Sequence, residues 1–237
     1  MRLQQPPQGG GGFQGLSASS QRGLGSHRVH SLHKGGVLVK IFIAATGVGN
    51  IHSLATALRR LGGEPEVTLS LRALREADAI VLPGVGSFSS ALRRLEPLRP
   101  HLLEAVESGA PTLGICLGYQ LFFRESEEGP GRGLELFKGR VVRLPKHVKA
   151  PHIGWNTLER VKQTPLTEGV EEGCFVYFLH SYYPVLEEQI AIAETTYGVT
   201  FPSIAGKPPA YGVQFHPERS GQVGLRILSN FLGEARR

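Results

Sequence analysis

Residues 114–120 read Gly-Ile-Cys-Leu-Gly-Tyr-Gln, and this stretch indicates how the chain presents a candidate nucleophile. The apolar run 111–115 favours a buried strand and residues 117–123 favour a helix, so Cys116 would occupy the turn between them. Gly114 and Gly118 lack Cβ, which lets chain segments approach closely and makes strained dihedrals cheap. Backbone N–H groups at the helix start would favour a Cys116 thiolate. The alternative is a small buried hydrophobic side chain, the usual role of a lone cysteine.

A second motif, Gly-Val-Gln-Phe-His-Pro-Glu at 212–218, contains an imidazole and a carboxylate two positions later. Pro217 favours an extended backbone at His216, and alternate side chains of an extended segment lie on one side. Glu218 can therefore accept a hydrogen bond from one ring nitrogen of His216 while the other faces Cys116, as in covalent hydrolases. Alone, His-Pro-Glu is more often a loop with a solvated acid. Its occurrence together with the cysteine turn favours catalysis.

The two motifs resemble the paired signatures of class I, triad-type glutamine amidotransferases. Three further segments at 83–88 (Pro-Gly-Val-Gly-Ser-Phe), 151–156 (Pro-His-Ile-Gly-Trp-Asn) and 177–183 (Tyr-Phe-Leu-His-Ser-Tyr-Tyr) resemble the HisH-type glutaminase subunit of imidazole glycerol phosphate synthase. The resemblance runs from about Val37 to the C-terminus. It departs at 45–50, where the family usually has Asp-Tyr-Gly-x-Gly-Asn and this chain has Ala-Thr-Gly-Val-Gly-Asn.

The resemblance implies an enzyme that hydrolyses glutamine to glutamate and ammonia with a triad of Cys116, His216 and Glu218. A thiolate attack on the carboxamide would give a thioester and expel ammonia, and water would then release glutamate. No cofactor is implied. The ammonia would pass to a separate (β/α)8-barrel cyclase subunit of the HisF type, which makes imidazole glycerol phosphate and AICAR in histidine biosynthesis. The expected assembly is a heterodimer.

The tetrahedral intermediate requires preorganised donors for its oxyanion. The expected donors are the backbone N–H of Leu117 and one from the loop formed by Gly84, Val85 and Gly86. Without the resemblance, an ordinary turn between a strand and a helix is the favoured interpretation of this loop.

The resemblance also implies that glutamine is bound by this loop, by Gln120 and by the Ser181 and Tyr182 region. Without it, Gln120 reads as an exposed helix residue and Tyr182 as a half-buried strand aromatic. Aromatic residues are favoured at interface cores, although core packing would account for them as well. The residues expected to face the cyclase are Trp155, Tyr177 and Arg219.

Two other functions remain open at this point. The chain can be the glutaminase subunit of another synthase, such as one for pyridoxal phosphate or anthranilate, because those enzymes share the triad. It can also be a noncatalytic regulatory module on the same fold. The intact Cys116, His216 and Glu218 argue against the second alternative.

From residue 37 onward, strand and helix patterns alternate, which predicts an α/β fold: an open, twisted, mostly parallel sheet with flanking helices, flavodoxin-like, with ligands beyond the carboxyl ends of its strands. Strands are predicted at 37–44, 66–69, 79–82 and 111–115, and helices around 54–61, 91 and 98–108. Shorter strands at 137–144, 157–161, 174–180, 190–196 and 210–215 predict a smaller mixed or antiparallel portion. A final helix is predicted at 222–232.

Composition divides the chain into two parts. Residues 1–36 hold nine glycines and no apolar periodicity, so we expect a disordered extension or a start-site artefact, followed by an amidotransferase domain at 37–237. These 36 residues contribute +4 of the net charge of +6, which argues against nucleic-acid binding by the remainder. Apolar runs are too short for a membrane span, the histidines lack metal-ligand spacing, and two cysteines suit a reducing cytoplasm.

Overall fold

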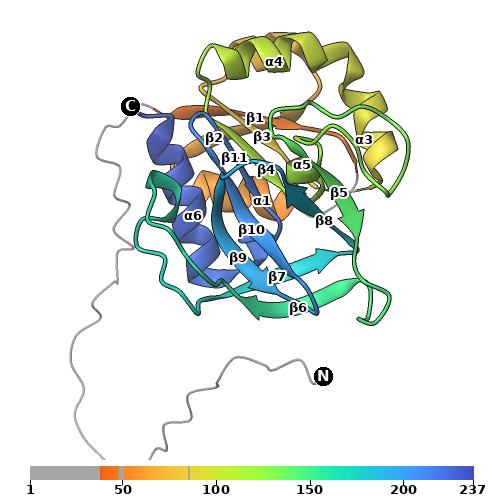
Figure 1. Cartoon of the computed structure of the whole chain (residues 1–237). Coiled ribbons are helices and arrows are strands. Elements are labelled where there is room, and N and C mark those ends of the chain that lie inside the picture. Colours follow the sequence, from red (N-terminus) through yellow and green to blue (C-terminus); the bar gives the residue numbers. More distant parts are fainter. Residues whose placement is uncertain (1–37, 48–50, 85) are drawn as a thin grey trace, which may run out of the picture.

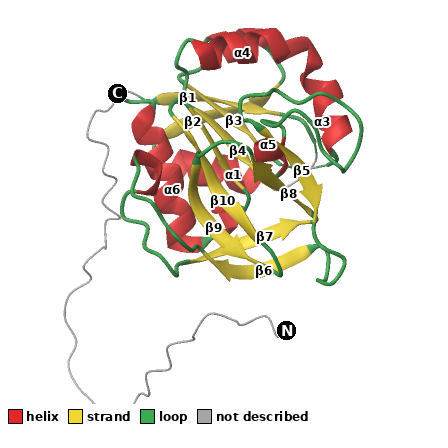
Figure 2. Cartoon of the chain, in the orientation of Figure 1, coloured by secondary structure: helices red, strands yellow, loops and turns green. Residues whose placement is uncertain are grey.

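The computed structural model describes residues 38–47, 51–84 and 86–237, so the predictions for residues 1–36 and Val85 lie outside the described residues. A seven-stranded sheet forms its centre (Figure 1, Figure 2). In spatial order the strands are β2 (Gly63–Thr68), β1 (Val39–Ala44), β3 (Ala79–Leu82), β4 (Thr112–Ile115), β11 (Ala210–Val213), β10 (Thr200–Lys207) and β9 (Ala191–Thr196). The first five are parallel, and β10 is antiparallel to both of its neighbours.

Helices cover both faces of this sheet because its central strands are apolar on both sides. In β1, Ile41 and Ile43 pack into one core with α1 (Ile51–Arg60) and α6 (Gly221–Glu234), while Phe42 packs into the opposite core. Burial of each such side chain stabilises the fold by roughly 1.5–3 kcal/mol. The opposite core is covered by α2 (Leu71–Arg75), α3 (Phe88–Leu95), α4 (Arg99–Glu107) and α5 (Leu117–Gln120).

Two antiparallel two-stranded sheets complete the fold. One pair joins β5 (Gly139–Arg143) to β8 (Tyr182–Leu186), and the other joins β6 (His152–Thr157) to β7 (Phe175–His180). In Figure 1, β6 and β7 cross beneath the lower ends of β9 and β10. Short 3-10 turns occur at η1 (Glu96–Leu98), η2 (Pro165–Thr167) and η3 (Pro217–Arg219). The predicted α/β architecture with a smaller antiparallel portion is confirmed.

Three predicted elements differ from the structure, and the first is the strand predicted at 66–69, because β2 begins three residues earlier, at Gly63. The strand predicted at 157–161 is wrong, because β6 ends at Thr157 and Glu159 forms only an isolated bridge with Glu194. Pairing with β7 selects the earlier segment and its register, which sets Trp155 opposite Tyr177. The helix predicted at 117–123 ends at Gln120, since the chain then tightens into a turn. Elements α2, β8 and β10 were not predicted.

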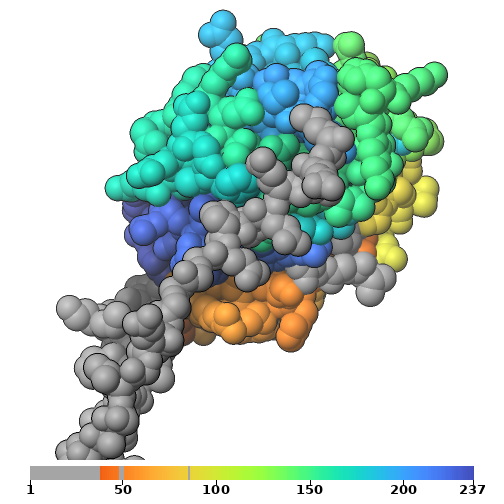
Figure 3. Space-filling model, turned by 90° about the horizontal axis from the view of Figure 1, so that it is seen from below, coloured from red at the N-terminus to blue at the C-terminus, as the bar shows by residue number. Residues whose placement is uncertain are grey.

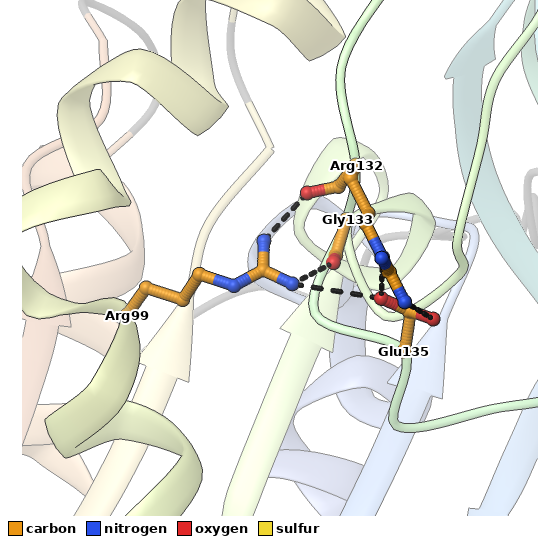
Figure 4. A network of polar contacts seen from close by, with 4 residues as sticks. All are labelled: Arg99, Arg132, Gly133 and Glu135. Carbon is orange, nitrogen blue, oxygen red and sulfur yellow. Dashed lines mark hydrogen bonds and ion pairs between the residues drawn. The ribbon is translucent and has the colours of Figure 1, made fainter.

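Arg99 fixes the loop between α5 and β5 to the start of α4 (Figure 4). Its guanidinium donates to the carbonyl oxygens of Arg132 at 2.6 Å and Gly133 at 2.7 Å. Arg132 in turn donates to the Glu135 carboxylate. The same loop contains Glu128, whose carboxylate accepts the Phe88 N–H at 2.8 Å. Glu128 also lines the cavity described below, so its contact with Phe88 positions part of the cavity wall.

At the departure from the family motif, Thr46 is buried after the end of β1, and the Ala45 N–H donates to Thr68 O at 3.1 Å. None of the helices in the described part of the chain has the length and apolar character that crossing a bilayer requires. Those residues also bring together no group of three His, Cys, Asp or Glu side chains suited to a metal ion.

Candidate active site

Cys116 stands on a strained turn between β4 and α5. Its φ of 52° and ψ of −108° place a non-glycine residue in a sparsely populated region of backbone space, and such strain concentrates at functional sites. The turn is held from both sides: the Cys116 N–H donates to Val213 O at 2.7 Å, and Cys116 O accepts the Gln120 N–H at 3.1 Å. The predicted nucleophile turn is therefore present in the structure.

Glycines allow other backbone segments to close around this turn. A Cβ added to Gly118 would lie 1.7 Å from Leu82 O, and one added to Gly84 would lie 2.3 Å from Leu117 N. A Cβ added to Gly114 would lie 2.7 Å from Gly118 O. Real Cβ atoms do not approach backbone atoms so closely, so the turn requires glycine at each of these positions.

His216 reaches Cys116 because β4 and β11 are adjacent parallel strands, with Ile115 paired to Val213. Both catalytic candidates leave the sheet at its carboxyl edge, the usual location of sites in such sheets. The backbone N–H of His216 donates to the backbone carbonyl of Tyr177 at 2.9 Å, and Ser220 Oγ donates to the backbone carbonyl of His216 at 2.7 Å. These two hydrogen bonds fix the backbone of His216, from which the imidazole extends.

Glu218 orients the imidazole. The turn η3 brings its Oε1 to 3.0 Å from His216 Nδ1, and both side chains are almost fully buried. Burial would lower the pKa of His216, but attraction and a hydrogen bond to Cys116, together with Glu218, raise it to about 10. Since Nδ1 faces Glu218, Nε2 is the nitrogen left for Cys116. At neutral pH His216 is therefore an imidazolium, protonated on both ring nitrogens, with its Nε2–H facing the sulfur.

This raised pKa predicts the pH dependence of turnover. The imidazolium persists until the pH approaches about 10 and loses its proton above that value, so glutamine hydrolysis should be sustained through pH 7–9 and fall as the pH rises further. The measurement is the initial rate of glutamate release against pH, with circular dichroism confirming the fold at each point. A fall centred near 6.5 as the pH rises would contradict the assigned protonation state.

The triad opens into a cavity of about 450 Å³. The predicted site residues that line it are Gly84, Gly86, Cys116, Leu117, Gln120, Ser181, Tyr182, His216 and Arg219. Glu218 lies behind His216, where it lines a neighbouring small hollow, and Val85 lies outside the described residues. The Leu117 backbone N lies next to Gly84, as an oxyanion site shared by the turn and the loop requires.

Gln214 is a site residue that the sequence interpretation missed. Its Nε2 lies 3.6 Å from Cys116 Sγ, and its Oε1 accepts from Gln120 Nε2 at 3.1 Å. Its position two residues before His216 in an extended segment was a usable signal, because alternate side chains share a side. The carbonyl oxygen of Leu179 is a second missed neighbour, at 3.5 Å from the sulfur.

Of the residues predicted to face a partner, Trp155 and Tyr177 lie on the β6–β7 pair and do not line the cavity, whereas Arg219 lies on η3 and lines it. Trp155 and Tyr177 are opposite each other with ring centroids 5.9 Å apart, and the Arg219 guanidinium lies 4.0 Å from the centroid of the Tyr177 ring. Ile153 and Leu179 form the neighbouring pair and are 43% and 38% exposed. We call these five residues the hairpin face.

This fold and this cysteine site define a class I glutamine amidotransferase, and the family model "Glutamine amidotransferase class-I" matches residues 45–235. The chain is 46% identical over 199 residues to imidazole glycerol phosphate synthase subunit HisH of Archaeoglobus fulgidus, covering 83% of this chain and 100% of that protein. It is 46% identical over 199 residues to the HisH subunit of Geobacillus kaustophilus, covering 80% and 94%. The chain belongs to the family of imidazole glycerol phosphate synthase HisH subunits, glutaminases of histidine biosynthesis.

Solved structures agree with the fold. The crystal structure of a glutamine amidotransferase matches with a TM-score of 0.66 and 21% identity over 83% of this chain and 98% of that chain. PurLQS from Thermotoga maritima matches with a TM-score of 0.65 and 19% identity over 83% and 99%. At these identities the likeness shows the fold alone.

Proposed function

We propose that Cys116, His216 and Glu218 act as the triad of this glutaminase and that its ammonia passes to a HisF-type (β/α)8-barrel cyclase in a heterodimer. The observation that carries the proposal is the alignment of the three side chains: the imidazole is hydrogen-bonded to the acid on one side and coupled to the sulfur on the other, and the sulfur and the imidazole line one cavity. A reducing cytoplasm suits this chemistry, because the nucleophile must remain a free thiol.

The proposed reaction has two halves. The Cys116 sulfur forms a bond to the carboxamide carbon, and the carbonyl electron pair moves to oxygen, where the Leu117 N–H and the loop that contains Gly84 and Gly86 would stabilise it. His216 then donates its proton to the amide nitrogen, and the C–N bond breaks. Ammonia departs, and a thioester of Cys116 remains. Water attacks the thioester while His216 accepts its proton, and glutamate departs as the thiolate returns.

In this proposal glutamine lies in the cavity between α5 and the start of β8. Gln120 Nε2 donates to Tyr182 O at 2.8 Å, and both residues line the cavity together with Ser181. This contact joins the helix that follows the nucleophile to the strand across the cavity. The predicted substrate-binding residues thus lie within one cavity with Cys116, which supports their assignment.

The hairpin face is the proposed docking surface for the cyclase. Ile153 and Leu179 present exposed apolar side chains beside two aromatic residues, and interface cores are enriched in such residues and in arginine. Leu179 and Arg219 also line the active-site cavity, so a partner docked here would cover the mouth from which ammonia leaves. Figure 3 views the molecule from below, which is the end at which β6 and β7 lie in Figure 1, with α1 in orange.

One experiment tests the proposal as a whole. The chain is mixed with a purified barrel cyclase of the HisF type, and glutamate release, formation of imidazole glycerol phosphate and the mass of the complex are measured. We expect a one-to-one complex in which glutamine supports cyclisation. No complex with the cyclase, or no glutamate release in its presence, would contradict the proposal.

Replacing Ile153 by aspartate tests the docking surface. A charge in the middle of the hairpin face should weaken cyclase binding by about tenfold to a hundredfold, or roughly 1.4–2.8 kcal/mol, because the carboxylate would be desolvated without a partner. Val67→Asp is the matched control, because Val67 is 41% exposed on the edge strand β2. This variant should bind the cyclase with wild-type affinity. Equal titration curves for the two variants in isothermal calorimetry would place the interface elsewhere.

A further inference from the structure

Two buried imidazoles lie in contact beside the cavity. His152 Nδ1 is 3.1 Å from His180 Nε2, and both side chains are almost inaccessible to solvent. The His152 ring is stacked between Phe178 and Tyr197, with centroid distances of 4.8 and 4.0 Å. His180 lines the active-site cavity, whereas His152 lies one layer farther from it. The reaction described above uses neither residue.

Burial keeps both rings neutral. It lowers the pKa of His152 to about 4 and, with the neighbouring His152 as a second cause, the pKa of His180 to about 3. A neutral imidazole has one donor and one acceptor nitrogen, so each hydrogen bond determines the next. Tyr182 O can only accept, and it lies 2.9 Å from His180 Nδ1. His180 Nδ1 therefore donates to Tyr182 O, and His180 Nε2 accepts from His152 Nδ1.

The same Tyr182 carbonyl is the start of a second series of bonds that ends at the nucleophile. It accepts from Gln120 Nε2 at 2.8 Å, and the other proton of this amide goes to Gln214 Oε1 at 3.1 Å. Because Oε1 is used in this way, Gln214 must turn its Nε2 toward Cys116 Sγ, at 3.6 Å. A donor facing the sulfur favours the thiolate, whereas an amide oxygen there would oppose it.

We propose that His180, held by His152, is a positioning residue for glutamine hydrolysis: it fixes the Tyr182 carbonyl, which orders Gln120 and Gln214 so that an N–H group points at Cys116 Sγ. The inference rests on the proposed function and deepens it. It assigns a role to a residue that lines the cavity, has His152 and Tyr182 as its hydrogen-bond partners, and acts on the sulfur through an ordered series of donors. Buried polar networks of this kind are effective only when every member is satisfied.

The test compares His180→Asn with His180→Gln in the complex with the cyclase. Both variants lose the ring contacts of His180 with Phe201 and Phe178. The asparagine amide lies near the position of Nδ1 and can still donate to Tyr182 O, whereas the glutamine amide lies near Nε2 and reaches only toward His152. We expect kcat to fall by about threefold in His180→Asn and by about thirtyfold or more in His180→Gln, with a smaller change in KM.

Alkylation of Cys116 by iodoacetamide provides a readout that needs no glutamine. Its rate should fall in His180→Gln and not in His180→Asn, since it depends on the fraction of thiolate. His152→Phe serves as a second variant, because it keeps the stacking on Phe178 and Tyr197 but removes the donor to His180, and it should also react slowly. Equal alkylation rates in the two His180 variants, or a wild-type rate in His152→Phe, would overturn the inference. A wild-type complex that alkylates normally but releases no glutamate would instead contradict the proposed function.

Discussion

Cys116→Ala is expected to reduce glutamine-dependent turnover by about 10⁴-fold or more, because it removes the atom that forms the thioester and no other group replaces it. Added ammonium salts should still support synthesis in the complex, since ammonia bypasses the glutaminase site. The alanine side chain is smaller than cysteine and should be accommodated at this buried turn. Glutamate release and ammonia-dependent cyclisation are measured on the same preparation.

Cys174→Ala is the matched control. Cys174 is the other free thiol of the chain, is partly exposed, and precedes β7 outside the cavity. Its replacement should leave both activities unchanged. If Cys116→Ala retained glutamine-dependent turnover, Cys116 would not be the nucleophile. If it lost the ammonia-dependent activity as well, the substitution would have damaged folding or assembly.

Gly118→Ala is expected to have the second large effect. The added Cβ would lie 1.7 Å from Leu82 O and 2.6 Å from Leu82 C, which belong to the backbone of a central strand and cannot rotate away. The turn must open or β3 must move, and we expect the free energy of unfolding to fall by at least about 3 kcal/mol, near the upper end for overpacking. Because the nucleophile and the Leu117 N–H share this turn, glutamine hydrolysis should be lost as well.

Gly233→Ala controls for the chemistry of the substitution. Gly233 lies in α6, and a Cβ added there meets no atom within 4 Å. Alanine has the higher helix propensity, so this variant should unfold at equal or slightly higher denaturant concentration. Urea unfolding followed by circular dichroism compares the two. Equal midpoints for Gly118→Ala and wild type would show that the turn tolerates a Cβ and that the close approach to Leu82 is not required.

The sequence was most informative where local patterns and burial agree. Buried parallel strands are continuous apolar runs, so β3 was predicted at its observed limits and β1 and β4 nearly so. It was least informative where pairing decides. The segment 152–157 contains histidine, glycine and asparagine and becomes a strand because β7 pairs with it, whereas 157–161 has the local pattern and no continuous partner. Strand preference depends on the neighbours that pack against the residue.

The sequence by itself was enough to predict Cys116 as nucleophile, His216 as its base and Glu218 as the acid that orients it, because a thiol between glycines and the His-Pro-Glu motif are local patterns with local chemical requirements. Only the tertiary structure decided which groups surround the sulfur. Leu179 and His180 lie on β7, His152 lies on β6 and Gln214 follows the end of β11, and their polar contacts depend on strand register to within a few tenths of an ångström. Alternation along the chain indicates that Gln214 shares a side with His216, but these contacts join residues far apart in the chain, so their distances and partners are not specified by a local pattern.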